Sequence, residues 1–211
     1  MPDDPKRIVA DGYDAIAERY ADWAASFESP TLAWVDKLLA RLEDGAQVLE
    51  LGCGGGGPAT QALAARHEVL GVDISPRQVE RARERVPGAR FLCADATGLE
   101  LEPARFDAVV SLHMLGHVPR VEQAPLLRSI ADWLKPGGRL LATMGTGGAP
   151  DEVEDDWLGA PMFFASFDER TNLQLLEDAG FVVEEAKVIP VEEPGHGVVS
   201  FMWVLAVRPE R

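Results

Sequence analysis

Glycine is concentrated in one stretch of the sequence, "VLELGCGGGG" at residues 48–57, where five of the last six residues are glycine. Glycine inside a regular element costs roughly 0.5–1 kcal/mol of stability relative to alanine, so stability does not explain this run. Glycines permit positive φ angles and let a ligand approach bare main chain. The spacing Gly52-x-Gly54-x-x-Gly57, between an apolar run and a helix signal at Pro58, predicts a nucleotide-binding loop. A flexible turn is the alternative.

Two aspartates follow at the ends of the next two apolar runs. Asp73 comes after Gly54 at close to the spacing of about 20 residues at which an acid reaches a ribose diol. Asp95, in "CADAT", ends the following run and is placed to accept a hydrogen bond from an adenine amino group. Both residues also fit helix-capping or loop aspartates, so these alternatives stay open at the level of sequence.

Histidines supply the candidate general bases. His113 and His117 follow the fourth apolar run, and histidine is mostly neutral and able to accept a proton at pH 7. If residues 113–118 are helical, the two side chains share one face. Positioning, cofactor contact or packing are alternatives for His113, and a backbone hydrogen bond that fixes the loop is the stronger alternative for His117. His67 is expected to be exposed. No Cys/His cluster has metal-ligand spacing, so no metal is expected.

These residues must be positioned by the strands and helices that alternate from residue 47 onward. Short apolar runs predict strands buried on both faces, and proline and glycine signals predict the helices between them. The alternation predicts an α/β fold with a parallel sheet, and the last two strands, which have no helix between them, should pair antiparallel at one edge. The predicted strands are 47–51, 68–73, 89–95, 106–112, 138–144, 181–189 and 199–207, and the predicted helices are 58–67, 76–86, 121–135 and 168–181.

Two further segments are expected to cover the site. An apolar stripe that includes Tyr13, Tyr20 and Trp23 predicts an N-terminal helix packed on the domain. Residues 145–167 are long for a connection in a compact domain, which favours a lid or binding loop hinged at its glycines. The alternative for the aromatic residues of this loop is ordinary packing against the last strands. The alternative for His196, in a later glycine turn, is an exposed loop position. The expected substrate contacts are Trp157, Met162, Phe163, Phe164 and His196.

Composition narrows the class of protein. The 211 residues suffice for one domain with a sizeable core. A net charge of −15 argues against a nucleic-acid partner and fits either solubility or attraction of a cationic ligand. No apolar run is long enough to span a membrane, and the first residues, "MPDDPKR", contain no apolar core, so secretion is not expected. Cys53 and Cys93 are expected to be reduced thiols, so a cytoplasmic location is expected.

Five motifs in order resemble those of the class I S-adenosylmethionine-dependent methyltransferases. Glu50, Gly52, Gly54 and Gly56 match the first motif, E/D-x-G-x-G-x-G. "VLGVDIS", "FLCADAT", "FDAVVSLHMLGHVPR" and "LKPGGRLL" resemble the following motifs, and "YDAIAERYADW" resembles the helix that often precedes the fold. The resemblance covers nearly the whole chain. It implies a Rossmann-like doubly wound sheet with strand order 3-2-1-4-5-7-6 and an antiparallel last strand.

The resemblance also implies a cofactor, S-adenosylmethionine, with S-adenosylhomocysteine as product. In the family the glycine loop lies against the methionine part of the cofactor, while the acids after the second and third strands hold the ribose and the adenine. One tyrosine of the N-terminal helix is expected near the cofactor carboxylate. The implied cofactor contacts are Tyr13, Tyr20, Glu50, Gly52, Cys53, Gly54, Asp73, Ile74, Asp95, Ala96, Ser111, Leu112 and His113.

The expected reaction is in-line displacement of a methyl group onto O or N of a small molecule. An NAD(P)-dependent oxidoreductase, which shares the first glycine motif and Asp73, is one alternative. A non-catalytic protein that binds the same cofactor is another. The chain is expected to form one domain, as a monomer or homodimer. Its expected parts are a cap helix (1–28), a cofactor-binding core (44–144), a lid (145–167) and a C-terminal helix with a strand pair (168–211).

Overall fold

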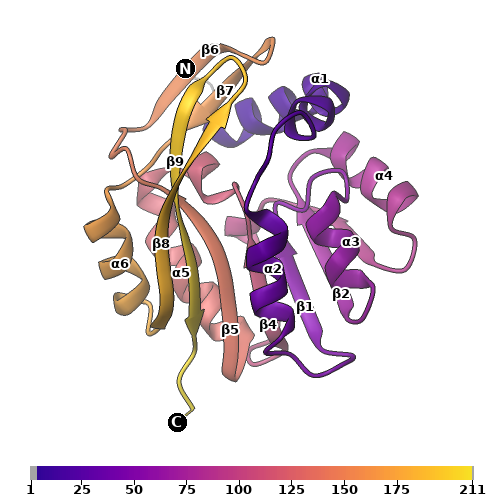
Figure 1. Cartoon of the computed structure of the whole chain (residues 1–211), viewed down its shortest axis with the longest axis vertical. Helices are drawn as coiled ribbons and strands as arrows, with labels where there is room; N and C mark the ends of the chain where they lie inside the picture. The colour runs from indigo at the N-terminus through magenta and orange to yellow at the C-terminus, as the bar shows by residue number, and fades with distance from the viewer. Residues whose placement is uncertain (1–3, 211) are drawn as a thin grey trace.

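The computed structural model describes residues 4–210, so residues 1–3 of the expected cap segment and residue 211 lie outside the described residues. Its centre is a seven-stranded sheet of order β3-β2-β1-β4-β5-β9-β8 (Figure 1). The first five of these strands in the chain run parallel, and β9 runs antiparallel to both of its neighbours. The predicted fold class and strand order are confirmed. The strands are β1 (Gln47–Leu51), β2 (Glu68–Asp73), β3 (Arg90–Cys93), β4 (Phe106–Ser111), β5 (Leu134–Gly145), β8 (Val182–Glu193) and β9 (Gly197–Val207).

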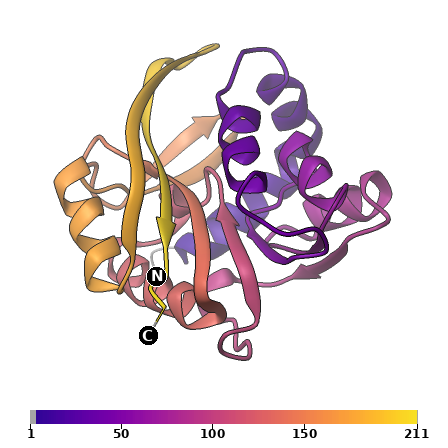
Figure 2. The ribbon, with the colours of Figure 1, turned by 60° about the horizontal axis from the view of Figure 1, so that its bottom comes forward.

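Helices cover both faces of the sheet, and Figure 2 shows α2 and α6 on opposite sides of the strands. Side chains of α2 and α3 pack with one set of alternating strand residues, and those of α5 and α6 pack with the other set. Two apolar clusters therefore sandwich the sheet, as expected for strands buried on both faces. The helices are α1 (Pro5–Ala24), α2 (Thr31–Leu39), α3 (Pro58–Ala64), α4 (Pro76–Arg85), α5 (Arg120–Trp133) and α6 (Glu169–Asp178).

Local signals fix where several helices begin. Ser75 caps α4 by accepting a hydrogen bond from the Gln78 amide, and a proline occupies the first turn. Pro125 lies inside α5, in the second turn after Arg120, where a proline removes one hydrogen bond of the helix. The carbonyl that loses its partner there belongs to Val121, which is 81% exposed, so water is available to it.

Residues 145–167 are not the open loop that their length suggested. They contain a hairpin of β6 (Glu152–Trp157) and β7 (Ala160–Phe164), which lies beside α1 at one end of the sheet (Figure 1). Cross-strand pairs place Glu154 opposite Met162, one exposed and the other buried. The hairpin packs against α1 mainly through the buried residues of β7, which include Met162 and Phe163, whereas β6 is exposed except for Trp157.

Three smaller expectations also change. Helix α2 was not predicted from the sequence. His67 is buried rather than exposed, because it directly precedes β2, whose pairing with β1 draws it into the domain. Residues 113–118 do not form an α-helix, because His113 has a φ of 57°, and only a short 3-10 turn follows at Leu115–His117.

A third apolar cluster holds the cap of the molecule together. It joins α1 to the β6–β7 hairpin through buried side chains that include Ile16, Trp157 and Met162. This cluster is separate from the two clusters that sandwich the sheet. We call α1 together with β6 and β7 the cap. Within residues 4–210, no helix is both long and apolar enough to cross a bilayer.

Candidate active site

A cavity lies between the cap and the carboxyl ends of the parallel strands β1, β2 and β4. It encloses about 740 Å³ of empty space, counted with its opening to solvent, which lies within the usual range of about 300–1,000 Å³ for small-molecule sites. Ligands of doubly wound sheets bind in this position, outside the carboxyl ends of the strands. Its lining residues include Lys6, Tyr13, Tyr20, Gly52, Gly54, Asp73, Ile74, Asp95, Ala96, Thr97, Leu112, His113, Met114 and His117.

The glycine loop presents bare main chain to this cavity. Gly52 and Gly54 have φ values of 73° and 52°, which L side chains rarely adopt. A Cβ added at Gly52 would lie 2.6 Å from the Cβ of Met114, so this position requires glycine for packing. A Cβ added at Gly54 would meet no atom within 4 Å, although this residue lines the cavity. The open space beside Gly54 is therefore available to a ligand.

Asp73 connects the end of β2 to this loop. Its Oδ2 accepts a hydrogen bond from the Gly54 amide at 2.8 Å, and its Oδ1 accepts one from the Ser75 amide at 2.9 Å. Burial raises the pKa of the Asp73 carboxyl, and the two amide hydrogen bonds oppose that shift. A carboxylate has about four acceptor positions, so both oxygens keep capacity for donors in the cavity, such as the two hydroxyls of a ribose.

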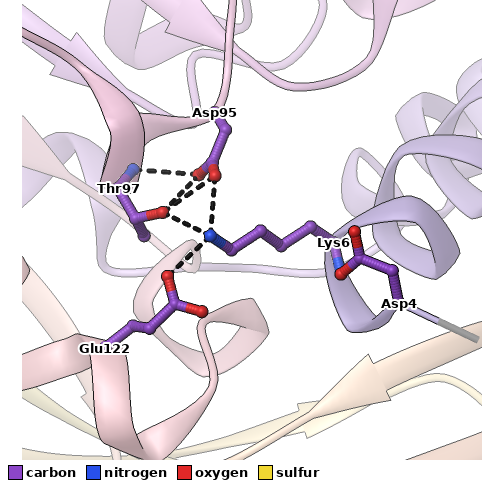
Figure 3. Close-up of polar contacts among 5 residues, drawn as sticks. All are labelled: Asp4, Lys6, Asp95, Thr97 and Glu122. Atoms are coloured by element: carbon purple, nitrogen blue, oxygen red, sulfur yellow. Dashed lines mark hydrogen bonds and ion pairs between the residues drawn. The ribbon is translucent and has the colours of Figure 1, made fainter. Parts of the chain in front are cut away.

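Asp95 lies at the end of β3 and is bound by a lysine that the sequence did not single out. Lys6, in the first turn of α1, contacts Asp95 at 2.8 Å and Glu122 at 2.6 Å (Figure 3). Thr97 donates to the same aspartate through its amide and its hydroxyl. Although burial raises the pKa of Asp95, the hydrogen bonds from Lys6 and Thr97 lower it below its ordinary value. Asp95 is therefore an ionised acceptor at the cavity wall.

His117 is held by hydrogen bonds at both ring nitrogens. Its Nδ1 lies 2.9 Å from the Phe163 carbonyl oxygen, which only accepts, so Nδ1 carries the proton. Its Nε2 therefore accepts the hydroxyl proton of Tyr13, at 2.8 Å. Burial lowers the pKa of His117 to about 4, so the ring is neutral at pH 7. Both nitrogens are occupied, which favours the structural alternative for this residue.

His113 differs from His117 because no described residue hydrogen-bonds to its ring. The ring packs edge-on against Phe201 and Trp203, with centroid distances of 4.8 and 5.5 Å. Its backbone is fixed by a 2.6 Å hydrogen bond from the His113 amide to the Thr143 hydroxyl. Burial, with a smaller contribution from His117, lowers the pKa of His113 to about 4. A neutral imidazole with an available nitrogen thus lines the cavity.

Three of the expected cofactor contacts are buried without forming part of the cavity lining. Glu50 is 4% exposed, and its Oε2 has no hydrogen-bond partner among the described residues. Burial raises its pKa to about 8, despite a hydrogen bond from Thr60, and the charge of Asp73 adds to the rise. Ser111 is fully buried, and burial raises the pKa of the Cys53 thiol. These residues support the loop from below.

The expected substrate residues lie in and around the cap. Trp157, Met162 and Phe163 are buried in the cluster that joins the hairpin to α1. Phe164 packs against the His117 ring at a centroid distance of 5.0 Å. His196, in the turn between β8 and β9, packs against Trp157 in a tilted arrangement with a centroid distance of 6.1 Å. None of these side chains belongs to the cavity lining, whereas Tyr13, Tyr20 and His117 do. Among residues 4–210, no group of three metal-ligating side chains converges.

Comparison with known proteins agrees with this geometry. The family described as "Methyltransferase domain" matches residues 48–138, a range that includes the glycine loop, Asp73, Asp95, His113 and His117. The 27-O-demethylrifamycin SV methyltransferase of Amycolatopsis mediterranei (strain S699) is 34% identical over 154 residues, covering 63% of this chain and 56% of that protein. Within residues 48–138, the chain belongs to the methyltransferase domain family. It spans about half the length of the curated relatives that it matches.

Solved structures share the whole methyltransferase fold at lower identity. The 1,6-didemethyltoxoflavin-N1-methyltransferase of Burkholderia thailandensis has a TM-score of 0.75 and 21% identity, with 100% of this chain and 91% of that chain covered. The [4+2]-cyclase SpnF has a TM-score of 0.73 and 20% identity, covering 96% and 95%. One of these two proteins is named for a different reaction, so the fold alone does not fix the chemistry.

Substitution of two glycines of the loop should have contrasting effects on ligand affinity and on fold stability. Gly54→Ala should weaken binding of S-adenosylhomocysteine by about tenfold, because the alanine methyl group would enter the cavity. This corresponds to a loss of about 1.4 kcal/mol of binding free energy. Gly56→Ala should mainly destabilise the fold, by about 1–3 kcal/mol, since its Cβ would lie 3.1 Å from Ala82 and Val86 atoms. Calorimetric titration and urea unfolding of both variants separate the effects. Equal affinity losses would mean that Gly54 does not face the ligand.

Glu50 makes a prediction about pH. Its carboxyl holds a proton up to a pKa of about 8 in the folded protein but only to about 4.5 in the unfolded chain. Folding therefore binds a proton between these values, and this group destabilises the fold as pH rises from 5 to 8. In the ligand-free state, Glu50→Gln should lose less stability than the wild type as pH rises over that range. Each kcal/mol of difference in the free energy of unfolding corresponds to about 2–4 °C in melting temperature. Thermal unfolding at both pH values measures the difference.

The exposed Glu43 provides the matched control for this pH prediction. Glu43→Gln should follow the wild-type dependence of melting temperature on pH, because the Glu43 side chain is exposed and not buried. If Glu50→Gln also follows the wild type, the Glu50 carboxyl is ionised in the folded protein and the proposed burial effect is wrong.

Proposed function

We propose that this protein transfers the methyl group of S-adenosylmethionine to an oxygen or nitrogen atom of a small molecule. The observation that carries the proposal is the Asp73 carboxylate, which is fixed by the Gly54 amide at 2.8 Å and lines the cavity beside bare main chain. The names of two similar proteins supply support: one is a methyltransferase of 27-O-demethylrifamycin SV, and the other is an N1-methyltransferase solved with S-adenosylhomocysteine.

The lining residues fit the parts of this cofactor. Asp73 would accept the ribose hydroxyls, and Ile74 would pack against the adenine. Asp95 would accept from the adenine amino group, while Gly52 and Gly54 would lie along the methionine part. When bound, the cofactor supplies a methyl group on positive sulfur, which is already activated for displacement. The protein's task is to orient an acceptor in line with that methyl group and to exclude water.

His113 would orient the acceptor at the methyl end of the site. Its neutral ring can accept a hydrogen bond from an O–H or N–H group, which directs a lone pair of the same atom toward the cavity. A pKa of about 4 makes the ring a weak base, so it suits an acceptor that loses its proton during or after methyl transfer. His117 would act through Tyr13, whose hydroxyl it fixes at 2.8 Å, and Tyr13 itself lines the cavity.

The cap would form the remaining wall of the acceptor site. Trp157 and Phe164 support Tyr13 and His117 from behind, with centroid distances of 5.8 Å from Tyr13 to Trp157 and 5.0 Å from His117 to Phe164. A wall of this kind favours a flat or apolar acceptor. The size of the cavity and the net charge of −15 favour a small acceptor over a nucleic acid. The free thiols of Cys53 and Cys93 favour a cytoplasmic location.

Cofactor binding tests the proposed function directly. The wild-type protein should bind S-adenosylhomocysteine in calorimetry, and Asp73→Asn should bind it roughly tenfold more weakly, because the amide cannot accept from both ribose hydroxyls and the loop amide. Asp44→Asn, at an exposed position, is the control. Tight binding of NADH with no binding of S-adenosylhomocysteine would contradict the proposal and favour an oxidoreductase.

His113 makes a separate prediction about turnover. With an acceptor found by screening hydroxyl- and amine-bearing small molecules, His113→Ala should lower kcat by about 10²-fold and change S-adenosylhomocysteine affinity less than twofold. Because the pKa of His113 is about 4, the wild-type rate should show no limb near pH 6.5. Wild-type turnover in His113→Ala would remove this residue from the reaction.

A further inference from the structure

The attachment of α1 to the rest of the molecule is unusual for a helix of 20 residues. Its buried apolar side chains, such as Val9 and Ile16, cluster with the β6–β7 hairpin and not with either face of the sheet. Apolar burial therefore holds the cap together internally. Ile74, which follows β2, extends this cluster to the end of the sheet, and polar contacts also keep α1 over the cavity.

Those polar contacts occur at several places along α1, including an exposed ion pair of Glu18 with Arg77 and a hydrogen bond from Trp23 to the Pro194 carbonyl. Lys6 contacts Asp95 and Glu122 near the start of the helix. Asp14 accepts from the Ser75 hydroxyl and, at 3.0 Å, from the Arg77 amide. Tyr13 donates to His117 at the opposite end of the cavity. Lys6 is the contact that crosses the end of the cavity where Asp95 lies, which is the adenine end under the proposed function.

The hydrogen-bond count around Lys6 is complete. An ammonium group has three N–H donors, and three acceptors surround it: Asp95 at 2.8 Å, Glu122 at 2.6 Å and the Thr97 hydroxyl at 2.7 Å (Figure 3). The Thr97 hydroxyl accepts from Lys6 and donates to Asp95. Contact with the two carboxylates raises the pKa of Lys6 above its ordinary value, although partial burial lowers it.

Asp95 keeps room for one more donor. Of its four acceptor positions, the Thr97 amide, the Thr97 hydroxyl and Lys6 fill three. An adenine amino group needs one. Lys6 and a bound cofactor are therefore compatible, and the lysine can stay on Asp95 while the ligand is in place. The side chains of Lys6, Asp95 and Glu122 are 27%, 32% and 33% exposed, so solvent can reach the ion pairs and they can break.

We propose that Lys6 is a positioning residue for the cofactor, whose bonds to Asp95 and Glu122 hold α1 closed over the adenine end of the cavity. The proposal rests on the proposed function. The bonds break when the cofactor enters or leaves, and they form again around it. The same helix carries Tyr13, so closure at the adenine end also brings the Tyr13 hydroxyl to His117 at the acceptor end.

The dissociation rate of S-adenosylhomocysteine tests the closure. Lys6→Met keeps the methylene stem that lines the cavity but removes all three donors. It should raise the dissociation rate roughly tenfold, because charge-assisted hydrogen bonds to partly exposed groups are lost. Lys6→Arg should restore most of the wild-type rate. Raising NaCl should speed release from the wild type more than from Lys6→Met, since salt screens the Lys6 ion pairs in addition to the Arg77–Glu18 pair that both proteins keep.

Arg7 provides the matched control in the same helical turn. It is 75% exposed and pairs only with Asp11 on its own helix, among the described residues. Arg7→Met should change the dissociation rate less than twofold, although it removes the same charge. A wild-type dissociation rate in Lys6→Met, or an equal rise in Arg7→Met, would overturn the role of Lys6.

Hydrogen exchange separates this proposal from the proposed function. In the ligand-free protein, amides of residues 5–24 should exchange faster in Lys6→Met than in Arg7→Met, while the sheet exchanges at the same rate in both. If the wild type binds no S-adenosylhomocysteine, the proposed function fails but this comparison still tests the closure. Equal exchange of α1 in the two variants would show that Lys6 does not hold the helix.

Discussion

The hydrogen bond from the Gly54 amide to the Asp73 carboxylate is the interaction on which the site depends. It joins the loop after β1 to the end of β2 at 2.8 Å, and it fixes both partners at the edge of the cavity. The loop reaches Asp73 only because Gly52 and Gly54 adopt positive φ values without a side chain. A single constraint thus aligns the bare main chain and the acceptor oxygens that a nucleoside ligand requires. Glu50 is buried nearby, and the charge of Asp73 contributes to the raised pKa of its carboxyl.

The cap and the sheet form different walls of the cavity. The sheet supplies fixed strand ends, supported by two apolar clusters that involve four helices. The cap has a small cluster of its own and meets the sheet through hydrogen bonds and ion pairs. Apolar burial makes each part rigid, whereas polar contacts that water can replace join them. Such an arrangement allows a cover to move as a unit without loss of its own packing.

Burial also decides the charge state of the groups around the cavity. Both histidines have pKa values lowered to about 4, so they are neutral at pH 7. Lys6 is the one cation that lines the cavity among the described residues, and two carboxylates and a hydroxyl take up its donors. The acceptor end therefore combines neutral imidazoles with tyrosine hydroxyls. These groups can direct a nucleophile by hydrogen bonding but do not supply a free positive charge for an anionic acceptor.

The family resemblance supplied the sheet order. The sequence alone determined the alternation of strands and helices, the glycine loop and the placement of Asp73 and Asp95 at the ends of successive strands. These features follow from short-range signals, because apolar periodicity and glycine spacing act within a few residues. Only the tertiary structure showed that residues 145–167 pair as a hairpin on α1, that Lys6 reaches Asp95, and that the Phe163 carbonyl fixes the proton of His117. These contacts join residues far apart in the chain. They depend on how the cap packs, which no local pattern encodes.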